Sequence, residues 1–172
     1  MTDVAAGAQT RSKTITWQDP LPTARLGATM TGFEYLTAIA EGRIPGPPIA
    51  AHFGMRWTHI GHGEVVAVIE PDESLYNPIG MVHGGVAATM LDSVVGCAVH
   101  TTLPAGVGYS SVELKVSYLR AIHAGRGEIR ATGRVVKEGS RIAFAEGEIR
   151  DAEGKLLATA SGTCVITRPA AA

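Results

Sequence analysis

The sequence contains few cysteines, few aromatic residues and little net charge. Two cysteines in 172 residues exclude a disulfide framework and suit a reducing compartment. The formal net charge of −1 gives no general attraction to nucleic acid or to an anionic membrane, so neither is an expected partner. Aromatic residues make up only 5%, whereas there are 21 glycines. We therefore expect a core built on close backbone packing rather than on large aromatic side chains.

Long uninterrupted apolar runs are also missing. No stretch reaches the roughly 18 apolar residues that a membrane-spanning helix needs. The nearest approach, residues 86–99, is interrupted by Asp92 and Ser93. Residues 1–31 lack the basic start and following apolar segment of a signal peptide. A soluble, cytoplasmic protein with no membrane partner is expected.

Length and composition predict one folded domain. Apolar residues are 45% of the chain, which is enough to build a core and excludes wholesale disorder. Residues 1–28 show no clear period and are expected to form an N-terminal arm or mobile tail. A single domain is expected over residues 29–168, followed by a short C-terminal tail over residues 169–172.

Periodicity and turn residues predict two helices and a series of strands. Thr31 and Glu34 form a capping-box pattern ahead of apolar residues at helical spacing, so a helix is expected there that ends by Pro45. A second helix, over residues 84–103, is apolar on nearly every face, which is typical of a buried helix. The expected strands cover residues 53–59, 64–71, 112–118, 127–137, 141–151 and 155–167.

One buried helix among several strands predicts an α+β architecture. A curved antiparallel sheet of about five or six strands would wrap the long helix, with the smaller helix preceding both. A single sheet wrapped around one helix leaves an exposed edge and an incomplete core. Pairing with a second copy of the chain would cover both.

Polar residues gather around the start of the predicted buried helix. They are Asn77, His83, Gly84, Gly85 and Asp92. A helix N-terminus presents unpaired backbone N–H groups and a partial positive charge, and glycine there lets a ligand approach the backbone closely. Such a site can hold an anion or stabilise a developing oxyanion.

Each of these polar residues also has a purely structural interpretation. A buried Asp92 could bond a neighbouring backbone group or a second subunit, or it could act as a general base or nucleophile. His83 could simply fix the loop before the helix. Asn77 precedes proline, which is a common turn signal. The residues alone leave these alternatives open.

The run Asn77-Pro-Ile-Gly-Met-Val-His83-Gly-Gly, followed by Asp92, resembles the PaaI-type hotdog-fold acyl-CoA thioesterases. The resemblance covers roughly residues 53–167 and includes the segments 116–120 and 135–140. It implies a long helix wrapped by a curved antiparallel sheet, and hydrolysis of acyl-CoA thioesters to the free acid and coenzyme A. It also implies a homodimer that forms the active site, and assembly into a homotetramer.

The same resemblance implies catalytic roles. The Gly84 N–H, together with Asn77, would polarise the thioester carbonyl, and His83 would position the thioester and the loop. Asp92 would activate water as general base or attack the acyl carbon itself. Ser110 would orient the water and is preferred to Ser111, which is assigned to substrate binding with Gly85.

Coenzyme A carries phosphates, so basic residues are expected at the mouth of the site. The candidates are Arg120 and the segment around the next turn, namely Lys137, Glu138, Gly139, Ser140 and Arg141. No motif for a metal site is present, and no cofactor is expected, since coenzyme A is part of the substrate.

Two other functions on the same fold remain as alternatives. One is a non-catalytic acyl-CoA-binding or regulatory module. The other is an acyl-thioester dehydratase or hydratase, for which the sequence around His52 offers only a faint match. The acyl group itself stays open between aromatic and aliphatic.

Overall fold

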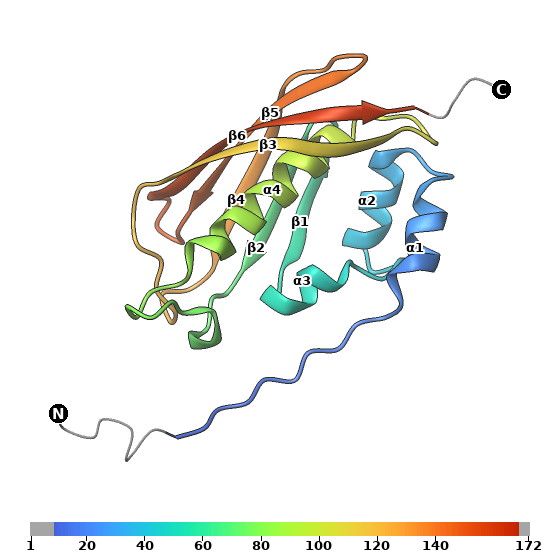
Figure 1. Cartoon of the computed structure of the whole chain (residues 1–172). Helices are drawn as coiled ribbons and strands as arrows, with labels where there is room; N and C mark the ends of the chain where they lie inside the picture. The colour runs from blue at the N-terminus through green and yellow to red at the C-terminus, as the bar shows by residue number, and fades with distance from the viewer. Residues whose placement is uncertain (1–8, 169–172) are drawn as a thin grey trace.

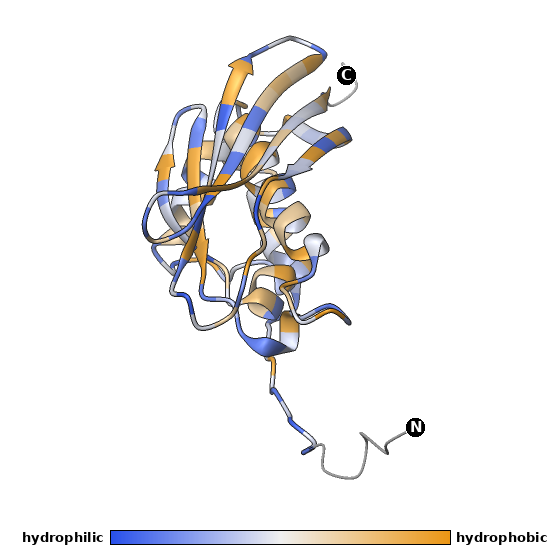
Figure 2. Ribbon diagram, turned by 90° about the vertical axis from the view of Figure 1, so that its left-hand side faces the viewer, coloured by the Kyte–Doolittle hydropathy of each residue, from blue (hydrophilic) through white to orange (hydrophobic). Residues whose placement is uncertain are grey.

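A six-stranded antiparallel sheet curves around one long helix in the computed structural model, which describes residues 9–168 (Figure 1). Figure 2 shows the curvature of the sheet from the side. The expected α+β architecture is therefore confirmed. In chain order the elements are α1 (Pro20–Gly27), α2 (Gly32–Ala40), α3 (Pro48–Phe53), β1 (Arg56–Gly61), β2 (Glu64–Ile69), the short 3₁₀ helix η1 (Glu73–Leu75), α4 (Gly84–His100), β3 (Gly108–Tyr118), β4 (Ile129–Lys137), β5 (Ile142–Arg150) and β6 (Leu156–Thr167).

The strand order is β1-β2-β4-β5-β6-β3, so β1 and β3 are the two edges of the sheet. Every neighbouring pair is antiparallel. Burial alternates along β5 and β6. The inward side chains of β2, β3, β4, β5 and β6 pack on α4, whereas β1 lies against α2, and the outward side chains form the convex face.

Glycine lets α4 approach the sheet closely. A Cβ at Gly133 in β4 would lie 2.2 Å from the carbonyl oxygen of Val94, and one at Gly162 in β6 would lie 2.7 Å from the Val95 side chain. Met90, Leu91 and Val94 are fully buried at this contact. The structure thus shows close packing of α4 on the sheet at glycine positions, as expected, rather than a core built on large aromatic side chains.

The N-terminal region differs from the expectation in two places. Residues 20–27 form α1 inside the segment expected to be an arm, because Asp19 caps the Leu21 N–H and Pro20 opens the helix. Helix α3 begins at Pro48, where the sequence predicted only a break, and it includes Phe53, which was expected to start a strand. Proline at the first helical position loses no hydrogen bond, so it begins a helix there rather than ending one.

The helix predicted after Thr31 is confirmed as α2, with both capping-box hydrogen bonds between Thr31 and Glu34. The division at residues 28 and 168 stays a prediction, and residues 1–8 and the expected tail at 169–172 lie outside the described part. Among the helices formed by residues 9–168, none is both long enough and apolar enough to cross a membrane.

Replacing Gly133 with alanine tests the close approach of α4. The added methyl group would collide with backbone atoms of Val94, which cannot rotate away as a side chain could. We expect Gly133→Ala to lower the free energy of unfolding by at least about 2 kcal/mol, measured by urea denaturation. Gly108→Ala is the matched control, since a Cβ there meets nothing within 4 Å. Equal stability of the two variants would contradict the proposed packing.

Candidate active site

The loop before α4 is held in place by hydrogen bonds from its own backbone. The Asn77 side-chain oxygen accepts from the N–H groups of Ile79 (3.0 Å) and Met81 (3.2 Å). The His83 N–H donates to the Leu75 carbonyl at 2.8 Å, and the Val82 N–H donates to the Ile122 carbonyl at 3.0 Å. These bonds fix the point at which the chain enters the helix.

His83 caps the helix in a way that leaves one backbone donor free. Its Nδ1 accepts from the Gly85 N–H at 2.8 Å, so the neutral ring carries its proton on Nε2 and presents a second donor. The Gly84 N–H has no hydrogen-bond partner among residues 9–168. It lies at the positive end of the helix dipole, which favours an anionic or partly charged oxygen.

Gly84 is also close to an aromatic ring that the sequence reasoning did not assign to the site. A Cβ at Gly84 would lie 3.2 Å from the Tyr118 ring. Apolar and polar residues alternate along β3 with Tyr118 in the apolar set, yet Tyr118 is 58% exposed. Its position beside Gly84 depends on the fold and has no signal in the local sequence.

Asp92 lies on an open stripe of α4, which corrects the expected all-round burial of this helix. Gly85 and Asp92 are exposed, and Thr89 and Ser93 are half-buried, whereas Met90 is fully buried on the opposite side. The sheet wraps only part of the helix circumference, so a polar stripe stays uncovered. The Asp92 carboxylate forms no hydrogen bond or ion pair with the rest of residues 9–168.

A β-bulge decides which of the two serines faces this stripe. The register between β3 and β6 shifts between Ser111 and Glu113, which makes Val112 the extra residue and leaves it 62% exposed. Ser111 pairs with the buried Cys164, whereas Ser110 pairs with the exposed Val165. The geometry therefore favours Ser111 over the Ser110 preferred from the sequence, because the bulge reverses the phase that simple alternation predicts.

Cys164 links Ser111 to Asp92. Burial raises the pKa of the Cys164 thiol, a hydrogen bond with Ser111 lowers it, and the charge of Asp92 raises it. The Cys164 thiol thus lies within electrostatic range of both Ser111 and Asp92.

Cys97 is not a nucleophile in this setting. Burial, as the largest effect, raises the pKa of its thiol to about 12, and a hydrogen bond with Tyr109 lowers it without offsetting the burial. The thiol therefore stays protonated at neutral pH, where only a thiolate would attack. The described residues contain no group of three or more side chains that could hold a metal ion.

The Gly84 N–H and the Asp92 carboxylate do not converge within one chain. Gly84 and Asp92 are eight residues apart on α4, a rise of about 12 Å at ~1.5 Å per residue. The two groups are therefore more than two helical turns apart along α4.

The candidate phosphate-binding residues fall at opposite ends of the domain. Arg120 follows β3, in the loop whose Ile122 carbonyl holds Val82, so it lies on the Gly84 side. The β4–β5 turn that contains the remaining candidates, Lys137, Glu138, Gly139, Ser140 and Arg141, lies near the other end of α4. The Gly63 carbonyl accepts from the Val135 N–H of β4, and the Gly63 N–H donates to the hydroxyl of Thr101, which follows the end of α4. The two groups therefore lie near opposite ends of α4, a helix about 24 Å long at ~1.5 Å per residue.

Comparison with known proteins identifies relatives of this chain. The family model of the thioesterase superfamily matches residues 79–158. A Halobacterium salinarum protein with a provisional esterase name is 34% identical over 124 residues, covering 68% of this chain and 80% of the relative. Human acyl-coenzyme A thioesterase 13 is 32% identical over 97 residues, covering 56% of this chain and 68% of the relative.

A solved structure agrees with these sequence relatives. A phenylacetic acid degradation-related protein of Ralstonia eutropha superposes with a TM-score of 0.70 at 31% identity, covering 76% of this chain and 98% of that chain. The resemblance to PaaI-type hotdog thioesterases, stated from the Asn77–Asp92 pattern, is confirmed.

Proposed function

Since this chain belongs to the thioesterase superfamily and is a thioester hydrolase, we propose that it hydrolyses acyl-CoA thioesters with Asp92 as the general base. The observation that carries the proposal is the free Gly84 N–H at the start of α4. The helix dipole is directed at that N–H, and an unpaired carboxylate lies on the same open stripe. A relative with an acyl-CoA name supports the substrate class.

The proposed mechanism assigns one role to each group. The thioester oxygen accepts from the Gly84 N–H, and His83 Nε2–H supplies a second donor nearby. Asn77 acts by ordering the loop, because its side-chain oxygen already accepts two backbone N–H groups. Asp92 takes a proton from water as the water oxygen attacks the acyl carbon, which gives a tetrahedral intermediate. The C–S bond then breaks, the carbonyl re-forms, and the proton held by Asp92 passes to the departing sulfur, so that coenzyme A leaves as the thiol. Ser111 orients that water.

The catalytic site is proposed to form between two chains. The second copy places its Gly84 opposite Asp92 of the first, which removes the separation along the helix within one chain. It would also cover the open stripe of α4 and the unpaired edge of β3. The β4–β5 turn of one chain would then approach the helix start of the other, where the phosphates of coenzyme A could meet Lys137 and Arg141.

A second association surface supports a homotetramer. The convex face of the sheet carries exposed apolar side chains at Val136, Ile142, Phe144 and Val165. Contiguous apolar patches of this kind mark interaction sites on soluble proteins. The proposed chemistry requires no cofactor. A cytoplasmic location is also proposed, because both cysteines are free thiols.

Replacing Asp92 tests the general base. We expect Asp92→Asn and Asp92→Ala to lower kcat by about 10²-fold or more, the scale of general-base catalysis. The measurement is release of free thiol from a panel of aromatic and aliphatic acyl-CoAs. Undiminished turnover in either variant would rule out Asp92. Wild-type protein that binds acyl-CoA without releasing thiol would show a binding module instead.

The two adjacent serines form a matched pair. Ser111→Ala should lower kcat by about ten-fold or more, because a water held by Asp92 alone is less well oriented. Ser110→Ala should leave kcat close to wild type, since this side chain lies on the other face of β3. A larger loss of kcat in Ser110→Ala than in Ser111→Ala would instead support Ser110 as the residue that orients the water.

Mixing two inactive variants tests the shared site. In a heterodimer of Asp92→Ala with His83→Ala, one of the two sites contains both substitutions and the other contains neither. Random exchange of subunits should therefore restore about a quarter of the wild-type activity. The check is thiol release after the variants are mixed, with each variant alone as control. Activity that stays at the level of the separate variants would place the whole site in one chain.

A further inference from the structure

Residues 9–19 form an extended strap outside the sheet (Figure 1). At one end, the ring of Trp17 stacks on His52 of α3, with ring centroids 5.9 Å apart. At the other end, two basic side chains reach the acidic turn at η1. The strap has little apolar contact of its own, since its side chains are exposed apart from the half-buried Ile15. Its position therefore depends on these few attachments.

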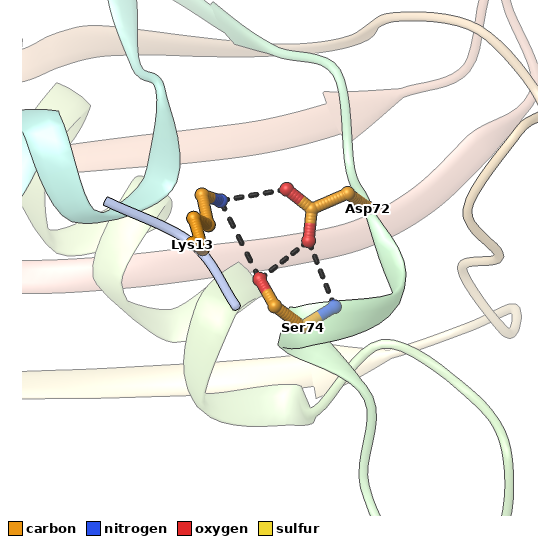
Figure 3. Close-up of polar contacts among 3 residues, drawn as sticks. All are labelled: Lys13, Asp72 and Ser74. Carbon is orange, nitrogen blue, oxygen red and sulfur yellow. Dashed lines mark hydrogen bonds and ion pairs between the residues drawn. The ribbon is translucent and has the colours of Figure 1, made fainter. Parts of the chain in front are cut away.

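The tie at η1 is a small network of charged and polar groups. Lys13 Nζ lies 2.6 Å from an Asp72 carboxylate oxygen and 3.4 Å from Ser74 Oγ. Asp72 also accepts from the Ser74 backbone N–H at 2.8 Å and from the Ser74 hydroxyl. Figure 3 shows Lys13 pointing from the strap at both partners. An additional ion pair joins Arg11 to Glu73 at 2.9 Å.

The electrostatics of Asp72 agree with this geometry. The hydrogen bond from Lys13, as the largest effect, lowers the pKa of the Asp72 carboxyl to about 2, and bonds from Ser74 act in the same direction. Asp72 is therefore ionised at neutral pH. The side chains of Lys13 and Asp72 are 36% and 49% exposed, so added salt will weaken their attraction.

The turn that Lys13 holds is connected to the helix start by backbone hydrogen bonds. Asp72 caps η1, and the Leu75 carbonyl at the end of η1 accepts from the His83 N–H at 2.8 Å. Tyr76 and Val82 form a bridge between the two arms of the same loop. A displacement of η1 would thus reach His83 and the free Gly84 N–H directly.

We propose that Lys13 is a positioning residue: its bonds to Asp72 and Ser74 fix η1, and η1 in turn holds His83 and the Gly84 N–H in place. This inference rests on the proposed function, because it concerns the group assigned to receive the thioester oxygen. Lys13 itself contacts no reacting atom. Its effect should appear in the chemical step rather than in substrate binding.

Kinetics of Lys13→Met provide the first test. We expect kcat to fall by roughly five-fold with KM unchanged, the change that corresponds to ~1 kcal/mol for a partly exposed ion pair. Lys13→Arg should recover much of the loss, because it keeps the charge. Lys155→Met in the β5–β6 turn is the matched control and should leave kcat unchanged. An effect confined to KM would overturn the proposal and indicate that the strap forms a wall of the substrate entrance instead.

A double-mutant cycle with Asp72→Asn separates positioning from general damage. If the tie is the cause, the double variant should have nearly the kcat of either single variant, and salt should lower kcat of the wild type toward that value. Additive losses, or losses that follow a lower melting temperature in every variant, would overturn the proposal.

Hydrogen exchange gives a readout that does not depend on turnover. In Lys13→Met, the amide of His83 should exchange faster while amides in the β4–β5 core keep their protection. Unchanged exchange at His83 would overturn the inference, even if the wild type hydrolyses thioesters. If the wild type hydrolyses none, the proposed function fails, and the exchange result still decides whether Lys13 orders the helix start.

Discussion

The close approach of α4 to the sheet is the constraint on which the rest of the structure depends. Because Gly133 has no side chain, the backbone of α4 can contact β4, and because Gly162 has none, the Val95 side chain can contact β6. Because the helix sits so deep, its buried face is entirely apolar and its direction is fixed. The curved sheet encloses that face only, so the opposite stripe of α4 stays open. The exposed position of Asp92 follows from this one packing arrangement, and so does the open surface that the proposed second copy would cover.

Much of the fold could be predicted from the sequence because its signals are local. The capping box at Thr31, the apolar run of α4 and the glycine turns each act over a few residues, and the elements they predicted are present. Two helices were missed: residues 1–28 were expected to be an arm because they show no clear period, and Pro48 was interpreted only as a breaker. Pro20 and Pro48 both begin helices, because the residues that follow can form a helical turn and the missing N–H costs nothing there.

The candidate site was less predictable, since it depends on phase and on contacts between distant segments. The Asn77–Asp92 pattern located the helix start correctly, but its residues do not reveal that Asp92 is exposed. Which of Ser110 and Ser111 faces α4 depends on the β-bulge at Val112, and nothing in the local sequence indicates that a bulge occurs there. Likewise, Tyr118 beside Gly84 and Lys13 beside Asp72 are pairs that only the tertiary structure brings together.

The open stripe of α4 also bears on how the proposed base would work. In a single chain, Asp92 is exposed and hydrated, and water around a carboxylate weakens its interaction with any one water molecule. Covering by a second copy would remove most of that solvent and strengthen every electrostatic interaction inside the site. The same covering would bring the partner's helix start, with its positive end, toward the developing oxyanion. In the proposed dimer, association and chemistry would therefore be coupled: the surface that excludes water would also supply the donor facing Asp92, and an isolated chain would lack both conditions.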